Sequence, residues 1–351
     1  MSWLYVFAGS DVSSLQKLIP VVVFVLASLS CAQSNASTVV LYTSLDQPIS
    51  EPIVREFEAQ TGIRVLASYD VEAAKTTGLV SRLAAERGNT RADVFWSSEY
   101  AQTLLLKDDG LLAPYDSPEA ADIPDAYRDP DRFWTGFAAR ARVILVNTKL
   151  VPQQQFPGSI FDLVNPAWGD GEVAIANPLF GTTSTHAAAL FAVLGPEKAK
   201  GLFEQMRARG FRVVDGNSVV RDMVASGEVK AGITDTDDAN DAVTKGAPVV
   251  VIYPDQDDGG LGTLVIPNTV ALVKNAPHPA AGKRLIDFLL SREVESRLAR
   301  SGSLQMPVRD GVPTPPGAPR LGEIRAMTVT PAAVAGQFSG SSAWIKEIFL
   351  R

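Results

Sequence analysis

The amino-acid sequence predicts an α/β protein of two doubly wound lobes joined by strands that cross between them. Apolar, β-branched segments typical of buried strands alternate with amphipathic helical segments in two separate stretches of the chain. This alternation favours mostly parallel sheets with helices on both faces. Two further apolar segments, residues 141–148 (ARVILVNT) and 262–274 (GTLVIPNTVALVK), border the second stretch. We expect them to carry the chain out of the first lobe and back, as a strand hinge.

The first lobe begins after a short polar stretch. Its first strand is VVLYTS, and the helix PISEPIVREFEAQTG follows with Ile49, Ile53 and Phe57 on one face. Gly62 ends this helix, because glycine adopts the left-handed conformation of a helix C-terminus without strain. The segments IRVLASYD and ADVFWSS are the next strands, and TTGLVSRLAAERG and YAQTLLLKDDGLL are the next helices.

The second lobe repeats the pattern. Its strands are GEVAIANP, FRVVDGN, VKAGITD and APVVVIYP, and its helices are TSTHAAALFAVLG, PEKAKGLFEQMRARG and SVVRDMVASGE. A late helix, APHPAAGKRLIDFLLSREVESRLAR, returns the chain to the first lobe. We therefore assign residues 38–142 and 266–351 to lobe 1 and residues 143–265 to lobe 2.

Composition excludes several classes of protein. The chain has 351 residues, of which 46% are hydrophobic, so it is long enough to bury a large core. Its net charge of -7 argues against nucleic-acid binding and against a polybasic membrane surface. With two histidines and one cysteine, the chain has too few ligands for a Cys/His zinc site and cannot form an internal disulfide.

The N-terminal residues 1–32 are typical of an export signal. Lys17 precedes LIPVVVFVLASLS, an apolar run that is short for a membrane span but suits a signal peptide. Cleavage before Gln33, lipidation of Cys31 as in a bacterial lipoprotein, and a retained membrane anchor all stay open. In each case we expect the body of the protein to be periplasmic or exported, and Cys31 is the candidate tether.

Polar residues gather where predicted strands end and the next helices begin. Gly181 with the hydroxyl residues after it would present free backbone N–H groups at the positive end of a helix, which suits an anion. The alternative is that these residues only cap their helices. The candidate ligand-binding residues of this kind are Thr43, Ser44, Gly181, Thr182, Thr183, Ser184 and Asn217.

Carboxylates end other strands. The segment GITDTDDAND (232–241) contains Asp237 and Asp238, and Asp46 and Glu99 follow two strands of the first lobe. Carboxylates that are close together must be protonated, paired or bound to a cation. A hard metal ion or a ligand ammonium group would serve. The alternative is that each carboxylate caps a helix or faces water.

Four segments together resemble a known family: VVLYTSLDQPISEPIVREFEAQTGIRV, ADVFWSSEYAQTLLLKDDGLLAPY, RVILVNTKLV and QMPVR. They are similar to the extracellular solute-binding proteins of ABC importers, and most of all to the ferric-iron-binding branch with its relatives for phosphonates and phosphorylated solutes. The resemblance implies the type II periplasmic binding protein architecture. It also implies that the two lobes close on a solute and deliver it to a membrane permease with its ATPase.

The resemblance also implies site residues. In the ferric-binding members a histidine, a glutamate and two adjacent tyrosines hold the iron, often with an anion. Asp46 falls at the histidine, Glu99 matches the glutamate, and Asp237 and Asp238 fall at the two tyrosines. Both phenolate ligands are thus replaced by carboxylates. The anion-binding positions correspond to Gly181, Thr182, Thr183, Asn217 and Asp235.

Two kinds of ligand satisfy both halves of such a site. The first is a hard, oxygen-liganded metal ion of the iron type, with or without a bridging phosphate- or phosphonate-type anion. We favour it because Asp46 and Glu99 are both potential ligands. The second is a zwitterion such as an aminoalkyl phosphonate, with its ammonium group near Asp237 or Asp238. Neither requires a further cofactor, and we expect a monomer.

An exported hydrolase is the alternative from another class. A Ser-His-Asp arrangement would need His186 or His278, and neither accompanies a nucleophile-elbow sequence. A glycosidase with two carboxylates is excluded less firmly, because Asp and Glu are plentiful. A sensory role stays open too. We expect no enzymatic activity.

Overall fold

The computed structural model describes residues 37–70, 76–315 and 320–349. The predicted signal at residues 1–32, with Cys31, lies outside the described residues. From Thr38 onward the chain forms one compact unit. Among the described residues, none of the helices combines the length and the apolar character that a membrane span requires.

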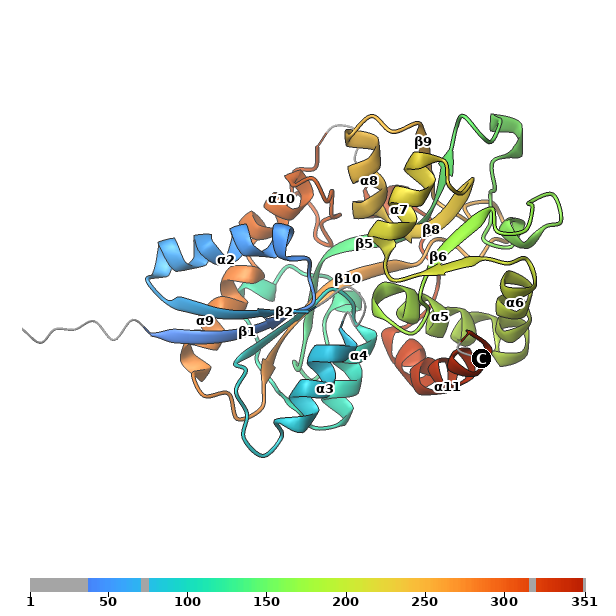
Figure 1. Cartoon of the computed structure of the whole chain (residues 1–351). Coiled ribbons are helices and arrows are strands. Elements are labelled where there is room, and N and C mark those ends of the chain that lie inside the picture. The colour runs from blue at the N-terminus through green and yellow to red at the C-terminus, as the bar shows by residue number, and fades with distance from the viewer. Residues whose placement is uncertain (1–36, 71–75, 316–319, 350–351) are drawn as a thin grey trace, which may run out of the picture. The chain divides into compact units, whose positions relative to one another are not determined.

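The sheet is the feature that organises the fold (Figure 1). Its strands follow the order β2-β1-β3-β10-β5-β8-β6-β7, and β4 and β9 pair with β10 and β5 respectively. The strands are β1 (Thr38–Thr43), β2 (Arg64–Tyr69), β3 (Val94–Ser97), β4 (Leu112–Ala113), β5 (Thr135–Asn147), β6 (Val173–Ala176), β7 (Arg212–Val214), β8 (Ala231–Asp235), β9 (Val249–Ile252) and β10 (Val265–Val273).

The two wings of this sheet are parallel, as predicted, and its middle is antiparallel. In the first wing β1 pairs in parallel with β2 and β3, and in the second β6 pairs in parallel with β7 and β8. Between the wings β5 and β10 run antiparallel to each other, because they carry the chain in opposite directions. These are the two predicted crossing strands, although β5 begins six residues earlier than expected.

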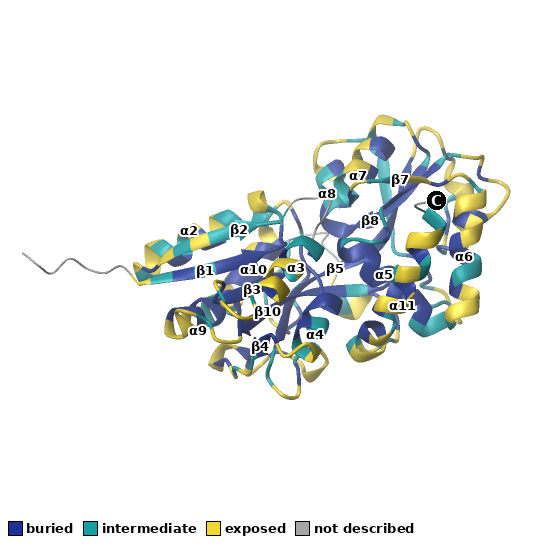
Figure 2. Cartoon of the chain, turned by 60° about the horizontal axis from the view of Figure 1, so that its bottom comes forward, coloured by how far each residue is buried: buried dark blue, intermediate teal, exposed yellow. Residues whose placement is uncertain are grey.

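Helices cover both faces of each wing. In the first wing α2 (Gln47–Thr61), α9 (Pro279–Leu289) and α10 (Arg292–Arg300) pack on one face, and α3 (Thr77–Ala85) and α4 (Ala101–Asp108) pack on the other. In the second wing α7 (Asn217–Ser226) and α8 (Thr236–Thr244) pack on one face, and α5 (Gly181–Leu194), α6 (Pro196–Ala208) and α11 (Pro331–Phe349) on the other. Figure 2 shows the central strands buried between these helices. The predicted doubly wound α/β fold is therefore confirmed.

The late helix that we predicted over residues 276–300 is two helices. The backbone of Ser291 is extended between α9 and α10, and its hydroxyl oxygen accepts a hydrogen bond from the Val294 N–H at 3.3 Å. A serine in this position caps the second helix and so separates it from the first.

The last helix, α11, contacts both wings. We assigned residues 266–351 to lobe 1, and Val334, Phe338 and Ile345 join a hydrophobic core that combines α5 and α6 with Tyr100 and Ala101 of the first wing. Trp344 contacts Phe191 of α5 with ring centroids 5.9 Å apart. This helix buries its apolar side against α5 and also packs on α4, and the local sequence indicates neither partner.

Gly232 in β8 provides a test of the packing between the sheet and α7. A Cβ atom at this position would lie 2.4 Å from Val220 Cγ1 and 3.1 Å from the carbonyl oxygen of Ala174. We expect Gly232→Ala to lower the free energy of unfolding by about 1–3 kcal/mol, because the core must shift to make room. Urea titration measures this change.

The matched control is Gly201→Ala in α6, where a Cβ atom would meet nothing within 4 Å. This change should be neutral or should stabilise by up to about 1 kcal/mol, since alanine favours helix over glycine. Equal effects of the two substitutions would contradict the packing described for β8.

Candidate functional site

Two buried arginines lie where the two wings of the sheet meet. Arg140 and Arg142 alternate with apolar residues in β5, so both side chains point to the same face of the sheet. Their exposed fractions are 2% and 1%. A buried charge is costly unless it is paired, so their partners define the polar centre of the molecule.

Arg142 is held entirely by the second wing. Its Nη1 lies 2.7 Å from Asp235 Oδ1 and 3.0 Å from Asn217 Oδ1, and it also donates to Thr182 Oγ1 at 3.2 Å. Nη2 donates to Thr183 Oγ1 at 3.3 Å. The starts of α5 and α7 and the end of β8 are thus tied together by one guanidinium group.

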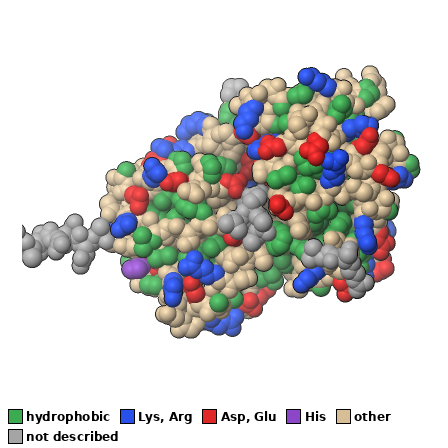
Figure 3. Space-filling view, in the orientation of Figure 1, with side chains coloured by type: hydrophobic (Ala, Val, Ile, Leu, Met, Phe, Trp, Pro, Cys, Tyr) green, Lys and Arg blue, Asp and Glu red, His purple; other side chains and the backbone are tan. Residues whose placement is uncertain are grey.

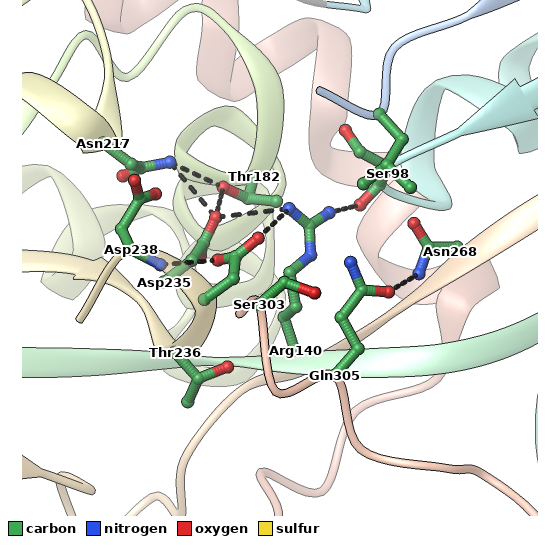
Figure 4. Close-up of polar contacts among 12 residues, drawn as sticks. Ser98, Arg140, Thr182, Asn217, Asp235, Thr236, Asp238, Asn268, Ser303 and Gln305 are labelled. Atoms are coloured by element: carbon green, nitrogen blue, oxygen red, sulfur yellow. Dashed lines mark hydrogen bonds and ion pairs between the residues drawn. The ribbon is translucent and has the colours of Figure 1, made fainter. Parts of the chain in front are cut away.

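Arg140 links the two wings. Its Nη1 lies 3.2 Å from Asp237 Oδ2 and 3.9 Å from Asp235 Oδ2, both at the start of α8 (Figure 4). Its Nη2 donates to the backbone carbonyl oxygen of Ser98, which follows β3. Burial would lower the pKa of Arg140, but Asp237, Asp235 and Asp46 outweigh it and raise the pKa above its ordinary value. This arginine therefore remains charged.

Asp235 is ionised for the complementary reason. Burial alone would raise the pKa of its carboxyl group, but Arg142 and Arg140 hold it below the ordinary value. The Oδ2 atom also accepts a hydrogen bond from Thr182 Oγ1 at 2.6 Å and one from Asn217 Nδ2 at 3.1 Å. Asp235 thus acts mainly as the counter-ion of the arginines.

A small cavity of about 20 Å³ lies beside these groups, between the starts of α5 and α7. Among the described residues, the N-cap positions of these helices, Phe180 and Gly216, contribute no side-chain cap. The first backbone N–H groups of a helix have no partner within the helix, and they carry a positive dipole end. We call this the helix-start pocket; it is lined by Ser98, Arg140, Ala176, Asn177, Phe180, Gly181, Thr182, Thr183, Asp215, Gly216, Asn217 and Asp235.

The predicted anion-binding residues divide between this pocket and the surrounding framework. Gly181, Thr182, Thr183 and Asn217 line the pocket. Ser184 does not line it, because its hydroxyl group donates to the carbonyl oxygen of Gly181 at 2.7 Å.

Thr43 and Ser44 also serve the framework. Thr43 Oγ1 accepts from the N–H of Leu45 at 3.2 Å, and Ser44 Oγ accepts from the N–H of Ser98 at 2.9 Å. The first bond is local to the loop after β1, and the second joins this loop to the one that follows β3.

A much larger cavity, of about 830 Å³, opens on the other side of the carboxylate cluster. Asp46 from the first wing and Asp237 and Asp238 from α8 all line it. We call it the acidic cavity. Figure 3 shows acidic side chains gathered between α2 and α8 on this face. The other charged residues of its wall are Asp70, Arg221, Asp241, Lys245, Arg297 and Arg300.

The carboxylates of α8 are close enough to share a cation. One oxygen atom from each of Asp235, Asp237 and Asp238 lies within 4.8 Å of the others. Asp237 and Asp238 also occupy the first turn of α8, where negative charge is stabilised by the helix dipole. The N-cap residue Asp235 makes no side-chain cap hydrogen bond, so the contribution of these carboxylates to the helix start is one of charge, which is compatible with ligand binding.

Glu99 is separated from this cluster. It is fully buried, does not line the acidic cavity, and accepts hydrogen bonds from the N–H groups of Ala101 and Gln102 at the start of α4. It also accepts a bond from Thr185 Oγ1 of α5 at 2.7 Å. The four predicted metal ligands are therefore not all brought together. The start of α4 holds Glu99, and Asp46 lines the same cavity as Asp237 and Asp238 but is not one of the carboxylates that lie within 4.8 Å of one another.

Arg140 and Arg142 were not among the residues that we predicted for the site. The signal was present, since two arginines at positions i and i+2 interrupt an otherwise apolar strand. Such a pattern places both charges on one buried face, which requires acidic partners.

Comparisons with known proteins agree with this architecture. A family model described as bacterial extracellular solute-binding protein matches residues 38–303. The "Iron uptake protein A1" of Synechocystis sp. is 28% identical over 302 residues, which cover 83% of this chain and 81% of that protein. The "Putative 2-aminoethylphosphonate-binding periplasmic protein" of Salmonella typhi is 27% identical, over 67% of each chain.

A solved structure shows the same fold. Iron-bound HitA from Pseudomonas aeruginosa superposes with a TM-score of 0.80 at 24% sequence identity, and the match covers 89% of this chain and 99% of that one.

Glu99 predicts a pH dependence of stability. Burial raises the pKa of its carboxyl group from the ordinary 4.5 to about 7, against the hydrogen bonds from Thr185, Gln102 and Ala101 and the charge of Arg140, which lower it. The fold therefore favours the protonated form. The resulting stabilisation is fully present below about pH 4.5 and is lost as the pH rises through 7.

The test compares Glu99→Gln with the wild type in urea titrations from pH 4.5 to 8, with a chelator present. The free energy of unfolding of the wild type should fall relative to that of the variant by up to about 3 kcal/mol over this range. Because the variant keeps every other titrating group, parallel curves would show that Glu99 has an ordinary pKa.

Proposed function

Because this chain belongs to the family of bacterial extracellular solute-binding proteins, we propose that it is the substrate-binding component of an ABC importer. In this proposal it binds a small solute between residues of its two wings and delivers it to a membrane permease with its ATPase. It acts as an exported monomer, tethered through Cys31 if that residue is lipidated, and it catalyses no reaction. An exported hydrolase finds no support in the relatives, which are named as binding and uptake proteins.

We further propose that the solute is a metal ion of the iron type with an accompanying anion. The observation that supports this most directly is the shared acidic cavity, lined by Asp46 from one wing and by Asp237 and Asp238 from the other. Carboxylate oxygens are ligands that hard metal ions prefer. A relative is named as an iron uptake protein, and it covers most of the chain.

We place the anion at the helix-start pocket, which at about 20 Å³ must widen to admit it. Two helices begin there, Arg140 lies in its wall, and Asp235 separates it from the acidic cavity. Such helix starts suit phosphate, phosphonate or carboxylate groups. A metal ion held by Asp237 and Asp238, with Asp46 approaching it from the other wing, would therefore lie next to an anion held by α5 and α7.

A phosphonate zwitterion is the second candidate, and the size of the acidic cavity favours it. A volume of about 830 Å³ is far more than a single ion fills. Asp237 and Asp238 line this cavity, so their carboxylates are the groups that an ammonium group would meet there. In this alternative the phosphonate would lie in the helix-start pocket. One relative is named as binding 2-aminoethylphosphonate.

Thermal unfolding of the purified, chelator-stripped protein distinguishes the candidates. A ligand that binds only the folded state increases the free energy of unfolding and so raises Tm. At a ligand concentration one hundred times Kd the increase in free energy is about 2.7 kcal/mol. We expect Tm to rise with ferric citrate or Mn²⁺. A rise with 2-aminoethylphosphonate alone would favour the second candidate. No rise with either ligand class would contradict both.

Substitution of the cavity carboxylates locates the site. We expect Asp46→Asn and Asp238→Asn each to weaken metal binding at least about tenfold, or ~1.4 kcal/mol, because each removes a charged oxygen ligand from opposite wings. Isothermal titration measures the affinity. The control is Glu228→Gln, whose exposed carboxylate pairs with Arg212 at 2.7 Å outside the cavity wall. An unchanged affinity in both cavity variants would mean that the ion binds elsewhere.

A further inference from the structure

We infer that Arg140 is an internal cation whose hold on Asp237 determines how strongly the carboxylate cluster binds a metal ion. This inference rests on the proposed function of the acidic cavity and adds a specificity-determining residue to it. The family likeness does not assign this role, which follows from the contacts of one side chain.

The guanidinium group of Arg140 occupies the side of the cluster that faces β5. Its Nη1 contacts Asp237 at 3.2 Å and lies 3.9 Å from Asp235, so it approaches two of the three carboxylates that could share an ion. A carboxylate oxygen that already accepts a charge-assisted hydrogen bond is a poorer ligand for a second cation. A metal ion that uses Asp237 must therefore compete with Arg140.

Hydrogen bonds fix the backbone directly before Arg140. They keep its side chain positioned next to Asp237. Ala138 N–H donates to Glu295 Oε1 at 3.0 Å, and its carbonyl oxygen accepts from Asn268 Nδ2. The next residue, Ala139, exchanges backbone hydrogen bonds with Met306 at 2.6 and 2.7 Å. These bonds anchor the strand directly before Arg140.

The other arginines of the region have different roles. Arg142 contacts Asp235 at 2.7 Å but is otherwise engaged by the starts of α5 and α7, so it serves as the structural counter-ion. Arg221 contacts Asp238 and Asp241 at 3.4 and 2.9 Å, but its side chain is 17% exposed and lies in the wall of the acidic cavity. Arg140, by contrast, is buried and contacts Asp237 directly.

Removal of this charge should increase the affinity for a metal ion. Without Arg140, less positive charge would neutralise the three neighbouring carboxylates. Carboxylates that are close together and not neutralised must be protonated or bind a cation. The same substitution should lower stability in a chelator, because it leaves a buried carboxylate with less compensation. A bound metal ion should restore that stability. Loss of stability together with a gain in affinity is not expected for a purely structural residue.

The experiment titrates Mn²⁺ alone into the full exported chain, with binding followed by calorimetry and by the EPR signal of free Mn²⁺. We expect Arg140→Met to bind Mn²⁺ at least about tenfold more tightly than the wild type. Arg140→Lys, which keeps the charge, should remain close to the wild type. The double variant Arg140→Met/Asp237→Asn should recover stability in a chelator and lose the gain in affinity. If Arg140→Met does not fold, Arg140→Gln, which can still donate to the Ser98 carbonyl, replaces it.

Equal or weaker Mn²⁺ binding by the charge-removing variant, including no binding at all, would overturn the inference. If the variant binds Mn²⁺ and the wild type does not, the result would support the role of Arg140 and count against a metal ion as the transported solute. A wild type that binds metal as tightly as the variant would leave the proposed function standing and refute the role of Arg140. The two failures are therefore distinguishable.

Discussion

The pairing of two buried arginines with the carboxylates at the start of α8 is the interaction on which the rest of the site depends. Arg142 and Asp235 are partners in the register of β5 and β8, so the ion pair is formed by neighbouring strands. Two desolvated guanidinium groups are tolerated only where acidic and hydroxyl groups surround them. That requirement brings the starts of α5, α7 and α8 to one point. The starts of α5 and α7 then line the helix-start pocket, and the starts of α7 and α8 line the acidic cavity.

The polar residues near the centre fall into two classes. Some form hydrogen bonds within the protein that hold the loops and helices in position, and others line the acidic cavity. Ser44 joins the loops after β1 and β3, and Glu99 caps α4 while it accepts a bond from Thr185 of α5. These groups have their hydrogen-bonding capacity satisfied within the protein, so they hold other residues in position. Asp46 and Asp238 lie in the wall of the acidic cavity, where a solute can reach them. Chemical type alone does not separate the two classes, since a buried carboxylate and a cavity carboxylate look alike in the sequence.

The crossing strands give the site its place between the wings. Thr135 to Ala141 of β5 pair with β10, and Arg142 to Val146 pair with β8, so the change of partner falls between Ala141 and Arg142. Arg140 therefore belongs to the crossing segment and Arg142 to the second wing. This position explains why Arg140 reaches Ser98 as well as Asp237, and why a solute bound there would contact both wings.

Local periodicity and turn and cap chemistry were enough to predict the alternation of strands and helices, the two crossing strands, and the acidic and small polar residues at strand ends. The sequence did not show that Glu99 turns to the start of α4, that Arg140 and Arg142 neutralise the aspartates, or that α11 packs on α5. Each of these depends on which groups, distant in the chain, meet after folding. Tertiary structure decided them, because a buried charge or an apolar helix face takes whichever partner the packing brings within reach.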